Sequence, residues 1–169
     1  MKFNQKIAKH LSGIGLSAAL VLAGAGTVSY YEGVSNKAYL DPVGIWTICY
    51  GETKGVGKGD YKTDEECLDS LAEELTEHHK KMVMYIKTPI SLKEEAAYLS
   101  FTYNVGVGAF SKSTLLKKLN SGERTEACNQ LLRWDKAGGK RLKGLTLRRE
   151  SENKLCLEGV KESNETATK

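Results

Sequence analysis

The feature that most constrains this chain is a run without any charged side chain, which extends over 21 residues from Leu11 to Tyr31. At about 1.5 Å per residue, a helix of that length spans roughly 31 Å, close to the hydrocarbon thickness of a bilayer. Lys2, Lys6 and Lys9 precede the run, which predicts that the N-terminus would stay on the cytoplasmic side of a membrane. The run is therefore expected to be either a membrane-directed segment or a helical part of the fold.

The run is only weakly hydrophobic. Small residues fill much of it, including Gly13, Gly15, Gly24 and Gly26, so little apolar surface would face lipid. Each glycine also lowers helix propensity by about 0.8–1 kcal/mol relative to alanine. We therefore expect a segment that can be exported but that is held weakly in a bilayer.

Three interpretations of this N-terminal part remain open from the residues alone. Ala23-Gly24-Ala25 resembles a small-residue cleavage site, which favours a cleaved secretory signal. Cleavage there would leave Glu32, the first charged residue after the run, only a few residues from a new N-terminus. The run also fits an amphipathic core helix and, less well, a permanent transmembrane anchor.

Composition assigns the rest of the chain to the globular proteins. Of 169 residues, 40% are hydrophobic and 27% are charged, which fits one packed domain with a short appendage. The formal net charge is +4 and the sequence pI is about 8.8. This excess suits an anionic surface, although charge alone does not separate a cell wall from nucleic acid.

The chain has four cysteines outside the uncharged run, namely Cys49, Cys67, Cys128 and Cys156. An even count in an exported chain favours disulfides, for which three pairings exist. No two of them have the C-x-x-C spacing of a zinc site, so we expect no metal and no cofactor.

Strand-favouring and turn-forming residues alternate between about 38 and 61, which predicts a small antiparallel sheet. Two capping boxes follow, Thr63 with Glu66 and Ser91 with Glu94. The first opens a long helix, and the second opens a helix that ends at the glycines of NVGVGAF. We expect the long helix over 64–86. Three further helices are expected over 113–120, 124–135 and 144–158.

These elements predict an α+β, mostly α fold. A small sheet lobe and a larger helical lobe would be joined by the long helix, with a cleft between the lobes. The expected divisions are an N-terminal segment over 1–31, a folded domain over 32–160 and a tail over 161–169. The tail is polar and terminal, and we expect it to be disordered.

Glu32, Asp41 and Thr47 are the candidate catalytic residues. Glu32 lies next to tyrosines, and a carboxyl shielded by aromatic groups is disfavoured as an anion, which suits a general acid. Asp41 lies in a turn where it can stay ionised, and the Thr47 hydroxyl can share the holding of a water molecule. Two carboxyl groups in different environments across a cleft suit glycoside hydrolysis, although this pair taken alone fits a solvated surface pair better.

The residues around this trio extend the pattern. From Glu32 to Gly51 the sequence reads E-G-x-x-x-x-x-Y-x-D-x-x-G-x-x-T-I-x-x-G. This stretch closely resembles the phage-type lysozymes, glycoside hydrolase family 24. Two later stretches resemble the helical-lobe motifs of the same family, FTYNVGVGAFSKSTLLKKLNSG over 101–122 and RWDKAGGKRLKGLTLRRE over 133–150. The resemblance covers about Tyr30 to Gly159, with three matches in the right order.

The resemblance implies a lysozyme-like fold and hydrolysis of peptidoglycan between N-acetylmuramic acid and N-acetylglucosamine. Glu32 would give a proton to the leaving oxygen, while Asp41, with Thr47, would stabilise the oxocarbenium-like transition state and position the attacking water. Inversion is the implied outcome, with an aspartate nucleophile as the alternative. Tyr103 and Asn104 match cleft positions that contact sugar, although a core role fits Tyr103 equally well.

Four further residues match or depart from family positions. For Trp134, Arg148 and Arg149 we expect packing and helix ion pairs. Glu52 stands where many relatives carry a histidine, so we expect an ion pair to be missing or reversed there. The proposed chemistry does not depend on that position.

With its weak N-terminal run, the chain also looks like the signal-anchor-release endolysins of lambdoid phages. That resemblance implies insertion of 11–31 into the host inner membrane by the export machinery, with the N-terminus cytoplasmic and the catalytic domain periplasmic. Release would let the run complete the small lobe and would start lysis of the host cell. We expect a monomer that binds peptidoglycan and no nucleic acid.

Relatives that activate by disulfide exchange keep a cysteine inside the anchor, and this run has none. We therefore expect structural disulfides and favour Cys49 with Cys67 and Cys128 with Cys156, although nothing in the residues excludes the other pairings.

Three competing functions fit less well. A lytic transglycosylase needs no water-positioning aspartate, so Asp41 disfavours it. A membrane-anchored wall-binding protein without activity does not need the trio that begins at Glu32. A pore-forming membrane protein fits badly with one weak span followed by a long polar chain.

Overall fold

The computed structural model describes residues 3–13 and 15–167, so Ile14 of the uncharged run and both chain ends lie outside it. The N-terminal part forms four short helical segments rather than one long helix. In chain order they are α1 (Phe3–Gly13), α2 (Ala18–Ala23), the π-helical turn η1 (Gly24–Val28) and α3 (Ser29–Glu32). Among the described residues, no helix has both the length and the apolar character that crossing a bilayer requires.

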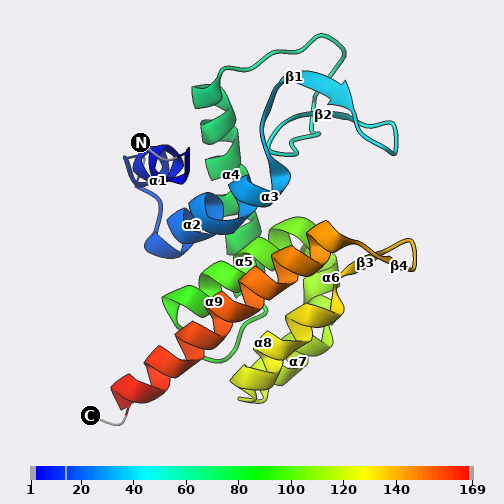
Figure 1. Cartoon of the computed structure of the whole chain (residues 1–169). Helices are drawn as coiled ribbons and strands as arrows, with labels where there is room; N and C mark the ends of the chain where they lie inside the picture. Colours follow the sequence, from blue (N-terminus) through cyan, green and yellow to red (C-terminus); the bar gives the residue numbers. More distant parts are fainter. Residues whose placement is uncertain (1–2, 14, 168–169) are drawn as a thin grey trace.

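A small antiparallel sheet follows, as predicted. Strand β1 (Ser35–Leu40) pairs with β2 (Trp46–Cys49), so that Tyr39 lies opposite Thr47 and Leu40 opposite Trp46. Helix α4 (Asp64–Val83) then runs from this sheet lobe towards the helical lobe (Figure 1). It begins at the predicted capping box, in which the Thr63 side chain accepts from the Glu66 amide and Glu66 accepts from Thr63.

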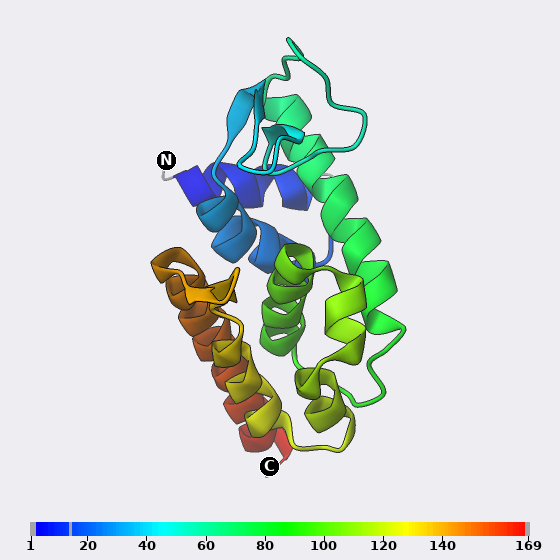
Figure 2. The ribbon, with the colours of Figure 1, turned by 90° about the vertical axis from the view of Figure 1, so that its right-hand side faces the viewer.

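The helical lobe is built around α5 (Leu92–Val105), which is buried along most of its length. The long C-terminal helix α9 (Lys143–Ala167) lies alongside α5 in both ribbon views (Figures 1 and 2). Shorter helices complete the lobe, namely α6 (Val107–Lys112), α7 (Thr114–Asn120), α8 (Arg124–Gln130) and the 3-10 turn η2 (Leu131–Arg133). The predicted two-lobed α+β architecture is confirmed.

A second, smaller hairpin, which was not predicted, connects η2 to α9. Strands β3 (Lys136–Ala137) and β4 (Lys140–Arg141) are joined by Gly138 and Gly139, whose φ angles are 56° and 76°. Two consecutive residues with positive φ are what a tight type I′ hairpin turn requires. Gly138 and Gly139 therefore build the turn of this hairpin.

The N-terminal run packs at the junction of the two lobes, against α4 and α5, rather than adding a helix to the sheet lobe alone. Leu11, Leu20, Ala23 and Val28 of the run are buried there, as is Ile7, which precedes the run on α1. Gly24 shows why small residues are needed, because a Cβ atom at this position would lie 2.7 Å from Leu11 Cδ1 and 2.8 Å from Leu75 Cδ1. The residues that make the run a poor membrane segment therefore allow it to pack closely in the fold.

Both expected disulfides are present, Cys49–Cys67 between the sheet lobe and α4 and Cys128–Cys156 between α8 and α9. The C-terminal end differs from expectation, because α9 continues to Ala167 instead of giving way to a disordered tail at Lys161. Ion pairing explains part of the difference, since Lys93 on α5 lies 2.5 Å from Glu162. Of the expected tail, residues 168–169 lie outside the described residues.

Candidate active site

Glu32 is the last residue of α3, where the N-terminal run meets the sheet lobe. Its Oε1 lies 2.5 Å from Nη1 of Arg148 on α9, and Arg148 is almost fully buried while Glu32 keeps a quarter of its side chain exposed. Its Oε2 faces Gly51, where a Cβ atom would lie 3.7 Å from that oxygen. Gly51 has a φ of 103°, which few other residues tolerate. One carboxyl oxygen of Glu32 is thus held by Arg148, and over residues 3–13 and 15–167 no hydrogen bond to the other oxygen is found.

A cavity of about 370 Å³ opens beside Glu32. Residues of both lobes line it, namely Glu32, Tyr50, Gly51, Thr53, Glu74, Glu77, His78, Tyr103 and Asn104. Three of the residues singled out from the sequence, Glu32, Tyr103 and Asn104, therefore lie around one cavity. Asp41 and Thr47 do not line it; they belong to the sheet lobe.

Asp41 and Thr47 both contact the turn at Ile45. The Oδ1 atom of Asp41 accepts hydrogen bonds from the backbone N–H groups of Val43 at 2.9 Å and Ile45 at 2.8 Å. Thr47 is 5% exposed, and its hydroxyl donates to the Ile45 carbonyl at 3.1 Å. Within the described part of the chain no hydrogen bond to Oδ2 of Asp41 is found. The turn therefore fixes the orientation of the carboxylate and leaves one oxygen available.

Tyr103 joins the two lobes at the cavity wall. Its hydroxyl lies 2.6 Å from Oε2 of Glu74 on α4 and 3.2 Å from the carbonyl oxygen of Tyr50, which follows β2. Burial raises the pKa of the Glu74 carboxyl, and the nearby carboxylate of Glu52 adds to this effect. Sequence reasoning missed Glu74, which has no motif and looks like one more acid on a helix rich in acidic residues.

A buried polar network lies behind Glu32 and Asn104. At its centre is Glu152, which has no exposed surface and accepts from Ser100 Oγ at 2.7 Å and from Arg148 Nε at 3.2 Å. Arg149 Nε lies 2.9 Å from the other oxygen of Glu152, and burial lowers the pKa of the Arg149 guanidinium. The helix ion pairs expected for the two arginines are confirmed. Glu152 was missed, although the spacing R-R-x-x-E would have indicated it.

Arg149 also fixes the side-chain amide of Asn104. Its Nη2 lies 3.0 Å from Oδ1 of Asn104. A guanidinium has only donors, so the atom facing it must be the amide oxygen. The amide NH2 group of Asn104 is therefore left for the cavity that Asn104 lines with Glu32.

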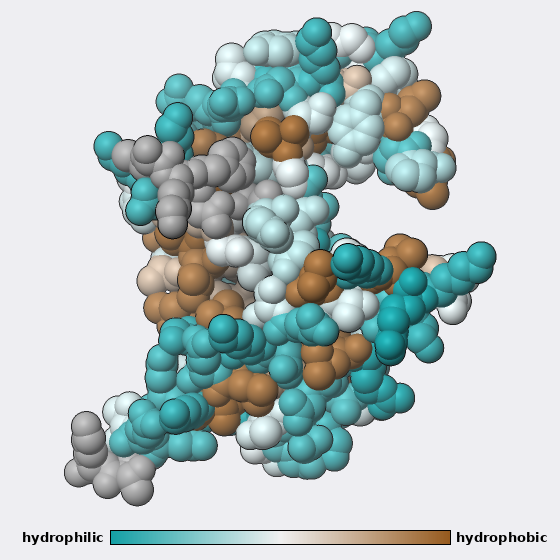
Figure 3. Space-filling view, viewed as in Figure 1, coloured by the Kyte–Doolittle hydropathy of each residue, from teal (hydrophilic) through white to brown (hydrophobic). Residues whose placement is uncertain are grey.

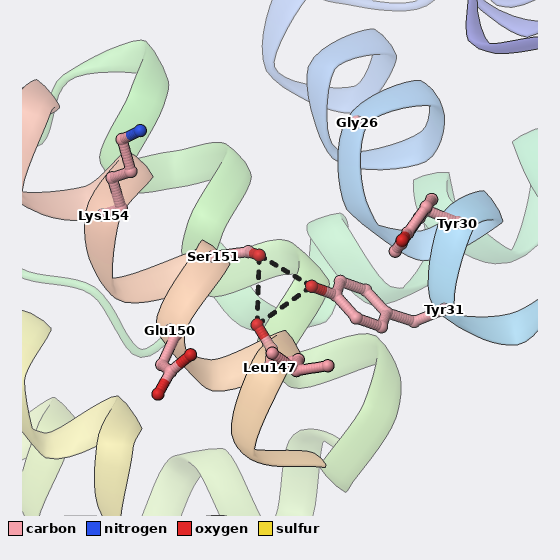
Figure 4. Close-up of a pocket in the computed structure, with 7 residues that line it drawn as sticks. All are labelled: Gly26, Tyr30, Tyr31, Leu147, Glu150, Ser151 and Lys154. Atoms are coloured by element: carbon pink, nitrogen blue, oxygen red, sulfur yellow. Dashed lines mark hydrogen bonds between the residues drawn. The ribbon is translucent and has the colours of Figure 1, made fainter. Parts of the chain in front are cut away.

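Tyr31, next to Glu32, ties the N-terminal run to α9 (Figure 4). Its hydroxyl lies 2.6 Å from Ser151 Oγ and donates to the Leu147 carbonyl at 2.9 Å. The Arg148 guanidinium lies 5.6 Å from the centre of the Tyr31 ring. A second cavity of about 500 Å³ opens at this contact, lined by Gly26, Tyr30, Tyr31, Leu147, Glu150, Ser151 and Lys154. These contacts fix the segment that carries Glu32.

Glu52, the position that departs from the family pattern, is paired. Lys62 Nζ lies 2.6 Å from Oε2 of Glu52 and donates to Ser70 Oγ at 2.8 Å. An ion pair is therefore present at position 52, with Glu52 as the acid and Lys62 as the base.

Comparison with known proteins gives three results that agree. The family model for phage lysozyme matches residues 29–152. A SAR-endolysin of Bacteriophage PS119 is 44% identical over 143 residues, which cover 84% of this chain and 86% of that protein. Among solved structures, the active form of the P1 phage endolysin Lyz superposes with a TM-score of 0.81 at 25% identity, covering 95% of this chain and 96% of that one.

The same P1 endolysin also has a solved structure in its secreted inactive form. Against that form the TM-score is 0.55 at 22% identity, covering 85% of this chain and 96% of that one. The fold described here thus resembles the active form more closely than the inactive form.

Proposed function

The chain belongs to the phage lysozyme family, and on that premise we propose that Glu32 and Asp41 carry out its hydrolysis of peptidoglycan. The activity is that of a glycoside hydrolase, an endolysin that degrades the host cell wall. The bond that we assign is the β-1,4 linkage between N-acetylmuramic acid and N-acetylglucosamine. The proposal rests on the position of Glu32, which is held through one oxygen and faces the cavity with the other.

Glu32 is the proton donor in this proposal. Arg148 occupies Oε1, so Oε2 is the oxygen that would carry the proton to the leaving glycosidic oxygen. The absence of a side chain at Gly51 leaves space for the sugar next to Oε2. Proton donation to the leaving group is the step that a glycosidase acid supplies.

Asp41 and Thr47 act from the sheet lobe. The two backbone donors on Oδ1 fix the orientation of the Asp41 carboxyl group, and its Oδ2 would face the positive charge that develops on the sugar. The Thr47 hydroxyl donates its proton to Ile45, so it offers only a lone pair to a bound water. Together the two groups would position the water that attacks the sugar from the face opposite Glu32.

Asn104 and Tyr103 bind sugar in this scheme. The NH2 group of Asn104 is a donor, so it would recognise an acceptor on the substrate, such as an acetamido carbonyl or a hydroxyl oxygen. The Tyr103 hydroxyl is already shared between Glu74 and Tyr50, so its ring, not its hydroxyl, would contact the substrate.

We also propose that the N-terminal run is first a membrane tether and then part of the active fold, with transport of the catalytic domain to the periplasm by the host export machinery. Tyr31 and Glu32 are adjacent, and both are fixed by contacts with α9 that residues held in a bilayer would not make. In a tethered chain, Glu32 would therefore not be held in the position that proton donation requires. The closer match to the active form of the P1 endolysin supports this order of events.

The direct test is clearing of purified peptidoglycan by the parent protein and by Glu32→Gln, with analysis of the new sugar ends. We expect the variant to lose almost all activity while its unfolding midpoint is retained. Reducing ends from the parent would support hydrolysis, whereas 1,6-anhydro ends would identify a lytic transglycosylase. A glutamine variant as active as the parent would exclude Glu32 as the acid.

A further inference from the structure

The positive charge of the chain is concentrated in one short segment. Residues 133–143 contain five basic residues and one acidic residue, so this segment has a formal net charge of +4, equal to that of the whole chain. The rest of the chain is therefore formally neutral. The basic residues of the segment are Arg133, Lys136, Lys140, Arg141 and Lys143.

Most of this segment is the β3–β4 hairpin, which we call the basic hairpin and define as residues 135–143. Its base is closed by a hydrogen bond of 2.9 Å from the Leu142 N–H to the Asp135 carbonyl. The residue before it, Trp134, packs its ring edge-on at 5.2 Å from Phe101 of α5. The hairpin is thus fixed to the helical lobe at its base, while its two strands are exposed.

Most of the charge on the basic hairpin is not neutralised. Asp135, its only acid, is 4% exposed and lies 2.6 Å from Nε of Arg141. Over residues 3–13 and 15–167, no ion pair joins Lys136, Lys140 or Lys143 to an acidic side chain, and all three lysines are exposed. Three ammonium groups therefore face solvent close together in sequence.

The basic hairpin lies at the opening between the lobes. In both ribbon views it projects from the helical lobe below the sheet lobe (Figures 1 and 2). The space-filling view shows a notch between them, whose lower edge is a projection with a hydrophilic tip and some hydrophobic atoms beside it (Figure 3). A polymer that enters the notch to reach Glu32 would pass this edge.

We propose that the basic hairpin binds the carboxylates of the peptide stems of peptidoglycan. This inference rests on the proposed function, because it places an anionic part of the same substrate. The amino sugars of the glycan carry little charge, whereas the stems attached to muramic acid carry more carboxylates than amines. Exposed charges of opposite sign attract each other over distances of about 10 Å at 0.1 M salt. Three lysines at the notch would therefore hold the carboxylates of such a stem near the cleft.

Lipid is a weaker partner for this surface. Strands β3 and β4 consist of Lys136, Ala137, Lys140 and Arg141. Leu142, which is 46% exposed, is the one large apolar side chain within 135–143, so the hairpin has little apolar surface to insert. Lasting attachment to a membrane surface needs buried apolar area as well as charge. The hairpin therefore fits an anionic polymer better than a bilayer.

The test combines a change in the protein with a change in the substrate. The triple variant Lys136→Gln, Lys140→Gln, Lys143→Gln removes the charge, and Lys80→Gln, Lys87→Gln, Lys117→Gln removes the same charge from exposed sites elsewhere in the helical lobe as a control. Each protein is assayed on purified peptidoglycan and on the same material after its carboxylates are converted to amides with carbodiimide and ammonia. Initial clearing rates are measured at low salt.

On intact peptidoglycan we expect the hairpin variant to be slower than the parent by about tenfold and the control variant to match the parent. On the amidated substrate the parent should slow to the rate of the hairpin variant. Equal rates of parent and hairpin variant on intact substrate, or the same loss on both substrates, would overturn the proposal.

Two further outcomes are distinguishable. If the parent and the hairpin variant clear peptidoglycan at the same rate and only the parent sediments with phosphatidylglycerol vesicles, the hairpin binds lipid and the proposal is wrong. If the parent digests neither substrate, the proposed function fails first and this inference fails with it.

Discussion

Arg148 on α9 contacts Glu32, 116 residues earlier in the chain, through a 2.5 Å ion pair. The same guanidinium donates to Glu152 and to the carbonyl oxygen of Ser100. The carboxyl of Glu32 is therefore positioned by a group that has little freedom of its own. Because Glu32 directly follows the N-terminal run, we expect this contact to form only when that run is folded against the domain.

Replacement of Arg148 by lysine should separate charge from geometry. Lysine keeps the charge but cannot reach three partners with fixed directions. We expect the clearing rate to fall by about 10- to 100-fold, because a small displacement of the acid is costly. The free energy of unfolding should fall by about 1–3 kcal/mol, since buried acceptors lose a donor. Arg133→Lys, at an exposed position, is the control; equal activity of Arg148→Lys and the parent would contradict the positioning role.

Asn104→Asp tests the direction of the cleft amide. The new carboxylate still accepts from Arg149, so the unfolding midpoint should be unchanged or raised. The donor that faces the cavity is replaced by an acceptor, and we expect kcat/KM to fall by about tenfold or more. Stability and activity would then move apart. An aspartate variant with full activity would show that the amide NH2 group has no part in binding substrate.

Glu74 should make stability depend on pH. Burial raises its pKa above the ordinary value of 4.5, so the folded protein binds this proton more tightly than the unfolded chain does. The contribution of the Glu74 proton to the free energy of unfolding is fully present below pH 4.5, the ordinary pKa, and is lost as the pH rises through the pKa of the folded state. The side chain at position 74 cannot titrate in Glu74→Gln. The unfolding midpoint of this variant, measured relative to that of the parent, should therefore increase as the pH rises from 4 to 7.

The control for this experiment is Glu73→Gln, an exposed neighbour on the same helix. The difference between the unfolding midpoints of Glu73→Gln and the parent should stay constant over the same pH range. Parallel curves for the parent and Glu74→Gln would mean that burial of the carboxyl carries no pH-dependent cost.

Local patterns in the sequence predicted much of the fold. The capping boxes at Thr63 and Ser91 start their helices as expected, because both depend only on residues three apart. Positive φ at Gly138 and Gly139 was not foreseen, because glycine after a helix fits either a helix end or a hairpin turn. The choice between them depends on tertiary contacts that the local sequence does not contain.

The residues of the candidate site likewise fall into those that local sequence patterns predict and those that depend on tertiary contacts. The spacing of Glu32, Asp41 and Thr47 was visible because all three lie within one short motif. Glu74 and Glu152 were not found, because their importance comes from burial next to Tyr103 and the two arginines. Burial of a charged residue depends on distant segments, and a single sequence shows only that the residue is charged.

The N-terminal run offers a last prediction, which separates membrane retention from folding. A Cβ atom at Gly13 would meet nothing within 4 Å, and at Gly26 it would lie 3.7 Å from Leu22 Cδ1, an ordinary contact. Leucine at both positions should therefore fit the released fold. In a bilayer each leucine would bury apolar surface, with a gain of about 1.5–3 kcal/mol.

We expect Gly13→Leu with Gly26→Leu to increase the membrane fraction and delay lysis, while the purified protein unfolds at the parent's midpoint. Gly13→Ser with Gly26→Ser, which adds no apolar surface, is the matched control and should lyse cells on the parent's schedule. Gly24→Leu should instead fail to fold, because its side chain would overlap Leu11 and Leu75. Lysis by the double leucine variant at the normal time, with no change in the membrane fraction, would show that weak hydrophobicity of the run does not set its release.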